Sequence, residues 1–292
     1  MTMFKSKPIP IRLTPLLLLL LAAAVAGPLP TTTAATENED RYVVLGTAIG
    51  EMLYAFGRGE AVVARDSSCQ LPAEIEEKPE IGYFRAVPVE GVLAMRPTEI
   101  FSTDAAGPPN AVAQLKASGI TYHEFSSEPT LDALRTNILR MGKLLDKPDR
   151  AEDLLGSLNR EILHIPEIAD TSRVEVLFLL SPPGSSQLLA AGAGTAAHAM
   201  IQLAGGRNVF ADMQGYRPVS AELIASHQPD VIFVPRRGDA DAASLGAEHA
   251  VIDRLVAGGQ SRRIEIDLAG TLAFGIRTGH AASALHRKLY QP

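Results

Sequence analysis

The chain has 292 residues, of which 46% are hydrophobic and 21% are charged, and its formal net charge is −6. The length exceeds that of a typical single domain, and the composition supports a folded core and excludes an intrinsically disordered chain. The acidic balance argues against nucleic acid as a partner, because phosphate binding requires an excess of lysine and arginine. The single cysteine, Cys69, excludes an internal disulfide.

The first 26 residues have the features of a secretory signal peptide. The basic segment contains Lys5, Lys7 and Arg12, and an apolar run over residues 13–25 follows it. The small residues Ala24-Val25-Ala26 form a candidate cleavage site. The apolar run is short for a membrane span, which needs about 20 residues, so we favour a cleaved signal peptide over an uncleaved anchor. A cut after Ala35 is the alternative site. Residues 27–40 are then predicted to form a flexible tail on a soluble periplasmic protein.

Strand signals alternate with helix signals in the next part of the chain, residues 41–128. We expect strands at 41–45, 61–64, 99–102 and 121–125, and helices at 49–56 and 111–117. Such alternation predicts a mostly parallel, doubly wound sheet. We therefore assign 41–128 to an N-terminal α/β lobe.

The middle of the chain, residues 129–168, is predicted to be a helical linker. Apolar residues recur at helical spacing over 131–145, and a second helical stretch begins at Pro148, with Asp146 as its expected cap, and runs to about Ile165. A helix of that length spans roughly 27 Å, enough to join two lobes.

The alternation resumes in residues 169–292, which we assign to a C-terminal α/β lobe. We expect strands at 174–180, 230–234 and 263–267. We expect helices at 196–203 and from about Thr278 to the end.

An internal repeat is the strongest single feature of the sequence. Three features recur in the same order in both halves: Gly46-Thr47-Ala48 and Gly194-Thr195-Ala196; Gly82-Tyr83 and Gly215-Tyr216; and a glutamate seven positions before a proline, Glu90 to Pro97 and Glu222 to Pro229. The repeat predicts two similar lobes. Because ligands bind beyond the carboxyl ends of parallel strands, we expect Tyr83 and Tyr216 to lie on the two walls of a shared cleft.

Several of these motifs resemble those of periplasmic haem-binding proteins of bacterial ABC haem importers. The motifs are Gly82-Tyr83-Phe84-Arg85, Val89-Glu90-Gly91-Val92-Leu93, Ala105-Ala106-Gly107-Pro108-Pro109, Gly194-Thr195-Ala196-Ala197, Ala204-Gly205-Gly206-Arg207-Asn208, Gly215-Tyr216-Arg217-Pro218 and Phe274-Gly275-Ile276-Arg277-Thr278. The Gly-Tyr-x-Arg motif is the haem-specific part, and the other repeated features are shared with cobalamin and siderophore binders. The repeat and the helical middle together predict two similar, doubly wound α/β lobes joined by a long helix, with the cleft between them. Such a rigid linkage predicts small closure on binding.

The resemblance implies that Tyr83 is the axial ligand of haem iron. A phenolate oxygen is a hard anionic ligand that suits ferric iron, and Arg85, two residues later, could stabilise the phenolate. On the residues alone, Tyr83 could equally be a wall residue. His198 is a weaker candidate for a second iron ligand.

Haem propionates require arginine or lysine partners. Arg217, in the second-lobe counterpart of the Tyr83 turn, is the first candidate, and Arg65 and Arg277 come next, with solvated surface charges as the alternative. Tyr216, Phe84 and Phe274 could contact the ring, with core packing as the alternative.

Glu90 and Glu222 occupy matching positions at the starts of two predicted helices. In the related importers such a pair docks on arginines of the permease, which we favour because the repeat puts the pair on matching faces of both lobes; a favourable interaction with the helix dipole is the alternative. The resemblance implies an ABC haem permease as the direct partner and the ATPase of that permease as an indirect one. An outer-membrane haem receptor system is a further implied partner.

The sequence thus favours a binding protein that captures haem (hemin) as transported cargo and delivers it to an ABC-type permease, without catalysis or a catalytic cofactor. A binder of ferric siderophore or cobalamin is the first alternative. A cleft hydrolase or transferase is the second, and Cys69 with a histidine would be its best nucleophile and base. Cys69 and Gln70 stand where the related proteins more often carry Ser, Thr or Tyr, so contacts from this loop are not predicted.

Overall fold

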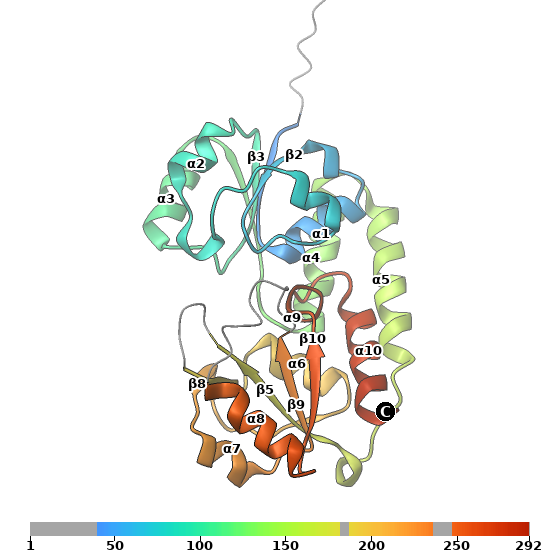
Figure 1. Ribbon diagram of the computed structural model, residues 1–292. Helices are drawn as coiled ribbons and strands as arrows, with labels where there is room; N and C mark the ends of the chain where they lie inside the picture. Colours follow the sequence, from blue (N-terminus) through green and yellow to red (C-terminus); the bar gives the residue numbers. More distant parts are fainter. Residues whose placement is uncertain (1–39, 182–186, 236–246, 292) are drawn as a thin grey trace, which may run out of the picture. The chain divides into compact units, whose positions relative to one another are not determined.

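The computed structural model describes residues 40–181, 187–235 and 247–291. The expected signal peptide, 1–26, and the expected tail, 27–40 apart from Asp40, lie outside the described residues. The described part contains two separate β-sheets, each covered by helices, so the predicted two-lobed α/β fold class is confirmed (Figure 1).

The first lobe is built on a four-stranded parallel sheet with the order β2-β1-β3-β4. Its strands are β1 (Tyr42–Leu45), β2 (Val62–Arg65), β3 (Glu99–Thr103) and β4 (Thr121–Phe125). β1 is buried at every position, as expected for a parallel strand with helices on both faces. In register, Val44 of β1 pairs with Phe101 of β3.

Helices cover both faces of this sheet. One face packs against α1 (Thr47–Ala55) and the helical middle of the chain, and the other packs against α2 (Val89–Ala94) and α3 (Pro109–Ala117). Short 3-10 segments make up much of the connections at η1 (Gly59–Ala61), η2 (Ala73–Glu77) and η3 (Phe84–Ala86). The last of these carries part of the Gly-Tyr-x-Arg motif.

The second lobe is built on a mixed sheet with the order β10-β9-β5-β6-β8, in which β7 also pairs with β5. Its strands are β5 (Glu175–Leu180), β6 (Leu189–Ala191), β7 (Arg207–Asn208), β8 (Tyr216–Pro218), β9 (Val231–Pro235) and β10 (Arg262–Ile266). The pairs of β6 with β5 and β8 are antiparallel, which the sequence did not predict. β6 and β8 have three residues each, too few to show a periodic pattern.

The helices of the second lobe are α6 (Ala196–Leu203), α7 (Ala221–His227), α8 (Ala247–Ala257), α9 (Leu268–Leu272) and α10 (Thr278–Tyr290), with a 3-10 turn at η4 (Asp170–Ser172). The boundaries of the strands and helices that the sequence predicted agree to within about two residues. The division into 41–128, 129–168 and 169–292 remains a prediction.

Two helices connect the lobes, α4 (Leu131–Leu144) and α5 (Pro148–Leu163). α5 has 16 residues, about 24 Å, and packs against α4 and against α10 (Figure 1). Ile162, near its end, contacts the buried cores of both lobes. Asp146 is not the predicted cap: Lys147 is the N-cap residue, and Asp146 lies before it in the left-handed conformation.

Close packing of α4 on α5 depends on Gly142. A Cβ added there would lie 2.6 Å from Ala151 Cβ and 3.2 Å from the Lys147 carbonyl oxygen, whereas a Cβ at Gly156 of α5 would meet only the end of the Arg160 side chain, at 3.3 Å. We expect Gly142→Ala to lower the free energy of unfolding by about 1–3 kcal/mol through overpacking. The matched Gly156→Ala should raise it by roughly 0.5–1 kcal/mol through helix propensity. Urea denaturation measures both, and a stabilising Gly142→Ala would contradict the packing described.

Candidate functional site

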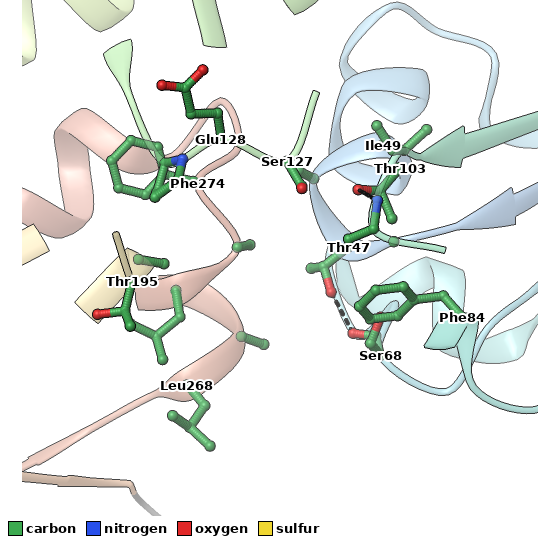
Figure 2. Close-up of a pocket in the computed structure, with 18 of the residues that line it drawn as sticks. Thr47, Ile49, Ser68, Phe84, Thr103, Ser127, Glu128, Thr195, Leu268 and Phe274 are labelled. Carbon is green, nitrogen blue, oxygen red and sulfur yellow. Dashed lines mark hydrogen bonds between the residues drawn. The ribbon is translucent and has the colours of Figure 1, made fainter. Parts of the chain in front are cut away.

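A cleft of about 750 Å³ lies between the lobes, beyond the carboxyl ends of strands from both sheets. The first lobe contributes residues 46–49 after β1, Thr103 at the end of β3, and the turn at 83–85. The second lobe contributes Thr195, Tyr216 and the segment 268–274. Figure 2 shows Thr47, Ser68 and Phe84 facing Thr195, Leu268 and Phe274 across this space. This is the position predicted for ligands in open α/β sheets.

The Gly-Tyr-x-Arg motif forms a turn on the first wall of the cleft. Gly82 has a φ of +98°, in the range that favours glycine. Tyr83 follows with 45% of its surface exposed. The Tyr83 and Phe84 rings meet edge to face with centroids 4.8 Å apart, and the Arg85 guanidinium lies 4.9 Å from the Phe84 centroid. Tyr83, Phe84 and Arg85 all line the cleft, which puts a phenol, an apolar ring and a cation on one wall.

The second Gly-Tyr turn lies on the opposite wall, as the repeat predicted. Gly215 has a φ of +69°, and Tyr216 begins β8 and lines the cleft. Burial raises the pKa of the Tyr216 hydroxyl to about 12, and the positive charge of Arg85 opposes this rise. Tyr216 is therefore a neutral phenol at ordinary pH. Of the two tyrosines it is the poorer candidate for an anionic metal ligand.

Phe274 supplies an apolar wall in the second lobe. It is buried, and its φ of +51° lies in the left-handed region, which is unusual for an aromatic residue. Its ring and that of Phe84 lie on opposite sides of the cleft (Figure 2). The cleft thus has aromatic surfaces on both walls.

Three of the predicted propionate partners lie outside the lining of the cleft. Arg217 is exposed, and its Nε donates to the Gln214 carbonyl oxygen at 2.9 Å. Arg65 is mostly buried and pairs with Glu80 at 3.3 Å. Arg277 lines a second cavity. Among the described residues that line the cleft, Arg85 is the one arginine. The propionate roles of Arg217, Arg65 and Arg277 remain predictions.

His198 also lies outside the cleft lining. Its Nδ1 is 3.2 Å from Asn208 Nδ2, its backbone N–H donates to the hydroxyl of Thr195, and burial lowers the pKa of its ring. A second iron ligand at His198 remains a prediction. In the described part of the chain, no three His, Cys, Asp or Glu side chains are grouped to hold a metal ion.

Asp66 is a residue that the sequence reasoning missed. It follows β2 directly and is fully buried. Its Oδ1 accepts hydrogen bonds from Gly46 N at 2.8 Å and Cys69 Sγ at 3.0 Å, and its Oδ2 accepts from Ser68 N at 3.0 Å and Phe84 N at 3.3 Å. One carboxylate therefore joins three loops at the cleft, including the Tyr83 turn. An aspartate directly after a strand, followed by two serines, was the available signal.

Cys69 has the properties of a structural thiol. It is buried, it donates to Asp66, and burial followed by the Asp66 charge raises the pKa of its thiol well above the ordinary value. A nucleophilic cysteine needs the opposite environment, partly exposed and electropositive. Gln70, next in the loop, lines the cleft.

Glu90 and Glu222 are both exposed and both lie in the first turn of a helix, α2 and α7 respectively. Hydrogen bonds to its own backbone N–H and to Ser220 lower the pKa of Glu222. The two carboxylates therefore occupy equivalent positions in the two lobes, as the repeat predicted. Among the described helices, none combines the length and the hydropathy that crossing a membrane requires.

Removing the Asp66 carboxylate should destabilise the first lobe. Asp66→Ala leaves three buried or half-buried backbone N–H groups and a thiol without their acceptor, and we expect a loss of at least about 2 kcal/mol in the free energy of unfolding. Asp66→Asn keeps one acceptor oxygen and should be intermediate. Asp104→Ala is the matched control, since Asp104 accepts one exposed hydrogen bond, from Ser127 N at 2.8 Å, and should cost no more than about 1 kcal/mol. Equal urea midpoints for the two alanine variants would contradict the role of Asp66.

Solved structures of heme-binding proteins are similar to this chain. The periplasmic heme-binding protein RhuT from Roseiflexus sp. RS-1, in apo form, is 34% identical, with a TM-score of 0.76 over 86% of this chain and 98% of that one. The periplasmic heme-binding protein BhuT in complex with two hemes is 31% identical, with a TM-score of 0.75 over 85% of this chain and 97% of that one. A periplasmic heme-binding protein from Pseudomonas aeruginosa is 29% identical, with a TM-score of 0.74 over 86% of this chain and 92% of that one.

Curated proteins similar in sequence include vitamin B12-binding proteins. That of Vibrio parahaemolyticus is 24% identical over 211 residues, 72% of this chain and 75% of its own length. That of Yersinia pestis strain Pestoides F is 26% identical over 204 residues, 69% of this chain and 71% of its own. A family model described as periplasmic binding protein matches residues 43–258, well over half of the chain. The chain therefore belongs to the periplasmic binding protein family.

Proposed function

We propose that this protein binds haem in the cleft between its lobes and delivers it to an ABC-type permease. The observation that carries the proposal is the Tyr83-Phe84-Arg85 turn on the wall of a cleft of about 750 Å³. That volume lies in the range of small-molecule and cofactor sites, roughly 300–1,000 Å³. The likeness to heme-binding proteins at 31–34% identity supports it.

The chemistry of the turn suits ferric haem. Tyr83 is the more exposed of the two cleft tyrosines, and its phenolate would be a hard oxygen ligand for iron. Arg85, on the same turn, puts a positive charge on this wall of the cleft. Phe84 and Phe274 offer apolar surface to the two faces of a porphyrin.

For the propionates we propose Arg85 and Arg217. Arg85 lines the cleft, and Arg217 follows the cleft residue Tyr216 in β8 and is exposed. Arg65 is the weaker proposal because it is already paired with Glu80. Arg277 would have to reach the cleft from the second cavity.

Hemin titration tests the proposal. The wild type should shift the Soret band on binding, and Tyr83→Phe should weaken affinity by at least about tenfold, equivalent to about 1.4 kcal/mol, and remove the charge-transfer bands of a ferric phenolate. Tyr216→Phe is the matched control, because burial holds that residue in the phenol form. It should keep the wild-type spectrum.

Two outcomes of this titration would count against the proposal in different ways. If wild-type protein does not change the hemin spectrum, haem is not the cargo. If Tyr83→Phe and wild type give the same spectrum, haem is the cargo but Tyr83 is not its ligand.

A cobalamin cargo is the second candidate, because the curated relatives cited above are named vitamin B12-binding proteins. Their identity to this chain is lower than that of RhuT and BhuT. Titration with cyanocobalamin beside hemin separates the two. If cyanocobalamin binds saturably and hemin does not, the cargo is cobalamin. If a ferric siderophore binds and neither of the other two does, the cargo is a ferric siderophore.

For location and partners we propose the periplasm, reached through a signal peptide at 1–26, and an importer made of a permease and its ATPase, with an outer-membrane haem receptor upstream. Membership of the periplasmic binding protein family supports this. Binding and release of cargo need no catalysis, and the buried, protonated Cys69 thiol does not favour an enzyme.

Glu90 and Glu222 are the proposed docking pair for the permease. Replacing both with arginine should abolish stimulation of the ATPase of a reconstituted haem importer and leave hemin affinity unchanged, because both carboxylates lie outside the cleft lining. Glu152→Arg, an equal charge change on the exposed face of α5, is the control for each substitution. Wild-type stimulation by the double variant would contradict docking through these residues.

A further inference from the structure

The contact between α1 and the segment 273–277 separates the cleft from a second cavity of about 650 Å³. The start of α1, residues 47–49, and residues 273–274 line the cleft. Glu51, Tyr54 and Ala55 from the later part of α1, and residues 276–277, line the second cavity. The same two segments therefore form the wall between the two spaces, with Glu51 and Gly275 in its middle.

Glu51 is buried within this wall, with only 3% of its surface exposed. A Cβ added to Gly275 would lie 2.2 Å from Glu51 Oε2 and 3.3 Å from Ala48 Cα, so the carboxyl group rests directly against the backbone of the second-lobe segment. Its other oxygen, Oε1, has no hydrogen-bond partner among the described residues. A carboxylate buried without partners carries a large desolvation cost.

The surroundings of Glu51 favour its neutral form. Burial raises the pKa of the Glu51 carboxyl to about 7; Arg277 opposes this rise and Asp267 adds to it. The other titratable groups around the second cavity are mostly acidic: Tyr54, Glu60, Glu74, Glu77 and Lys78. Arg277 offsets only part of the cost of a negative charge on Glu51, because the pKa of the carboxyl remains raised.

We propose that Glu51 is a positioning residue of the cargo cleft: its carboxyl group rests on Gly275 and thereby sets where the segment 273–277, and with it the cleft residue Phe274, lies relative to α1. The contact itself is independent of the cargo. Its effect on cargo affinity rests on the proposed function.

The direction of the pH effect follows from linkage. When α1 and 273–277 separate, water reaches Glu51 and the pKa of its carboxyl returns toward its ordinary value of 4.5. The contact is therefore most stable below pH 4.5, and this stabilisation is lost as the pH rises through about 7. Between pH 6 and pH 8 the closing equilibrium should weaken about tenfold.

Hydrogen–deuterium exchange of cargo-free protein tests the contact. After correction for intrinsic rates, peptides covering 268–277 should lose protection about tenfold between pH 6 and pH 8 in wild type. Glu51→Gln, a neutral isostere, should keep the same protection at both pH values. Glu60→Gln, an exposed residue of the second cavity, is the control and should behave as wild type. Equal pH dependence in wild type and Glu51→Gln would overturn the proposal.

A second pair of variants tests the geometry without a titration. Gly275→Ala should reduce protection of 268–277 at both pH values, because its Cβ meets the Glu51 oxygen. Adding Glu51→Ala removes that oxygen and should restore part of the protection, because the approach to Ala48 Cα at 3.3 Å remains. No recovery at all would show that the carboxyl does not rest on Gly275.

Hemin affinity gives the functional readout. The ratio of the Glu51→Gln affinity to the wild-type affinity should rise about tenfold from pH 6 to pH 8, whereas haem chemistry common to both proteins cancels in this ratio. A constant ratio would overturn the coupling to cargo and leave haem binding intact. Absence of hemin binding in either protein would overturn the proposed function, and the exchange experiment would still decide the role of Glu51.

Discussion

The site depends first on the buried carboxylate of Asp66. It accepts four hydrogen bonds, from Gly46, Ser68, Cys69 and Phe84, and these donors come from three loops that meet at one end of the first sheet. A fully buried carboxylate is tolerated because donors satisfy both of its oxygens. The backbone of the Tyr83 turn is thereby tied to the end of β2 and to the start of α1.

The second constraint is the connection between the lobes. α5 packs against α4 and α10, and Ile162 contacts both cores, so the two walls of the cleft are joined by packed helices rather than by a flexible crossing. Asp66 orders one wall, and the Glu51–Gly275 contact sets the position of Phe274 on the other.

Much of the architecture could be predicted from the sequence because strands, helices and turns depend on local sequence patterns. Gly82 and Gly215 both adopt positive φ, and the tyrosine after each lies on the cleft, as the repeat indicated. Contacts between residues far apart in the chain leave no such local pattern, so they could not be predicted. Arg65 and Arg277 lie outside the cleft because of partners far along the chain or because of the packing of the lobes. The hydrogen bonds of Asp66 and the burial of Glu51 have the same kind of cause. The antiparallel strands β6 and β8 were too short to give a period.

The central claim is that Tyr83 ligates haem iron in this cleft, and a crystal structure of the hemin complex tests it most directly. We expect the iron to be bonded to the Tyr83 hydroxyl oxygen, with the porphyrin between Phe84 and Phe274 and at least one propionate at Arg85. Iron bonded to any other side chain, or a porphyrin lying outside the cleft, would show that Tyr83 does not hold haem in this way.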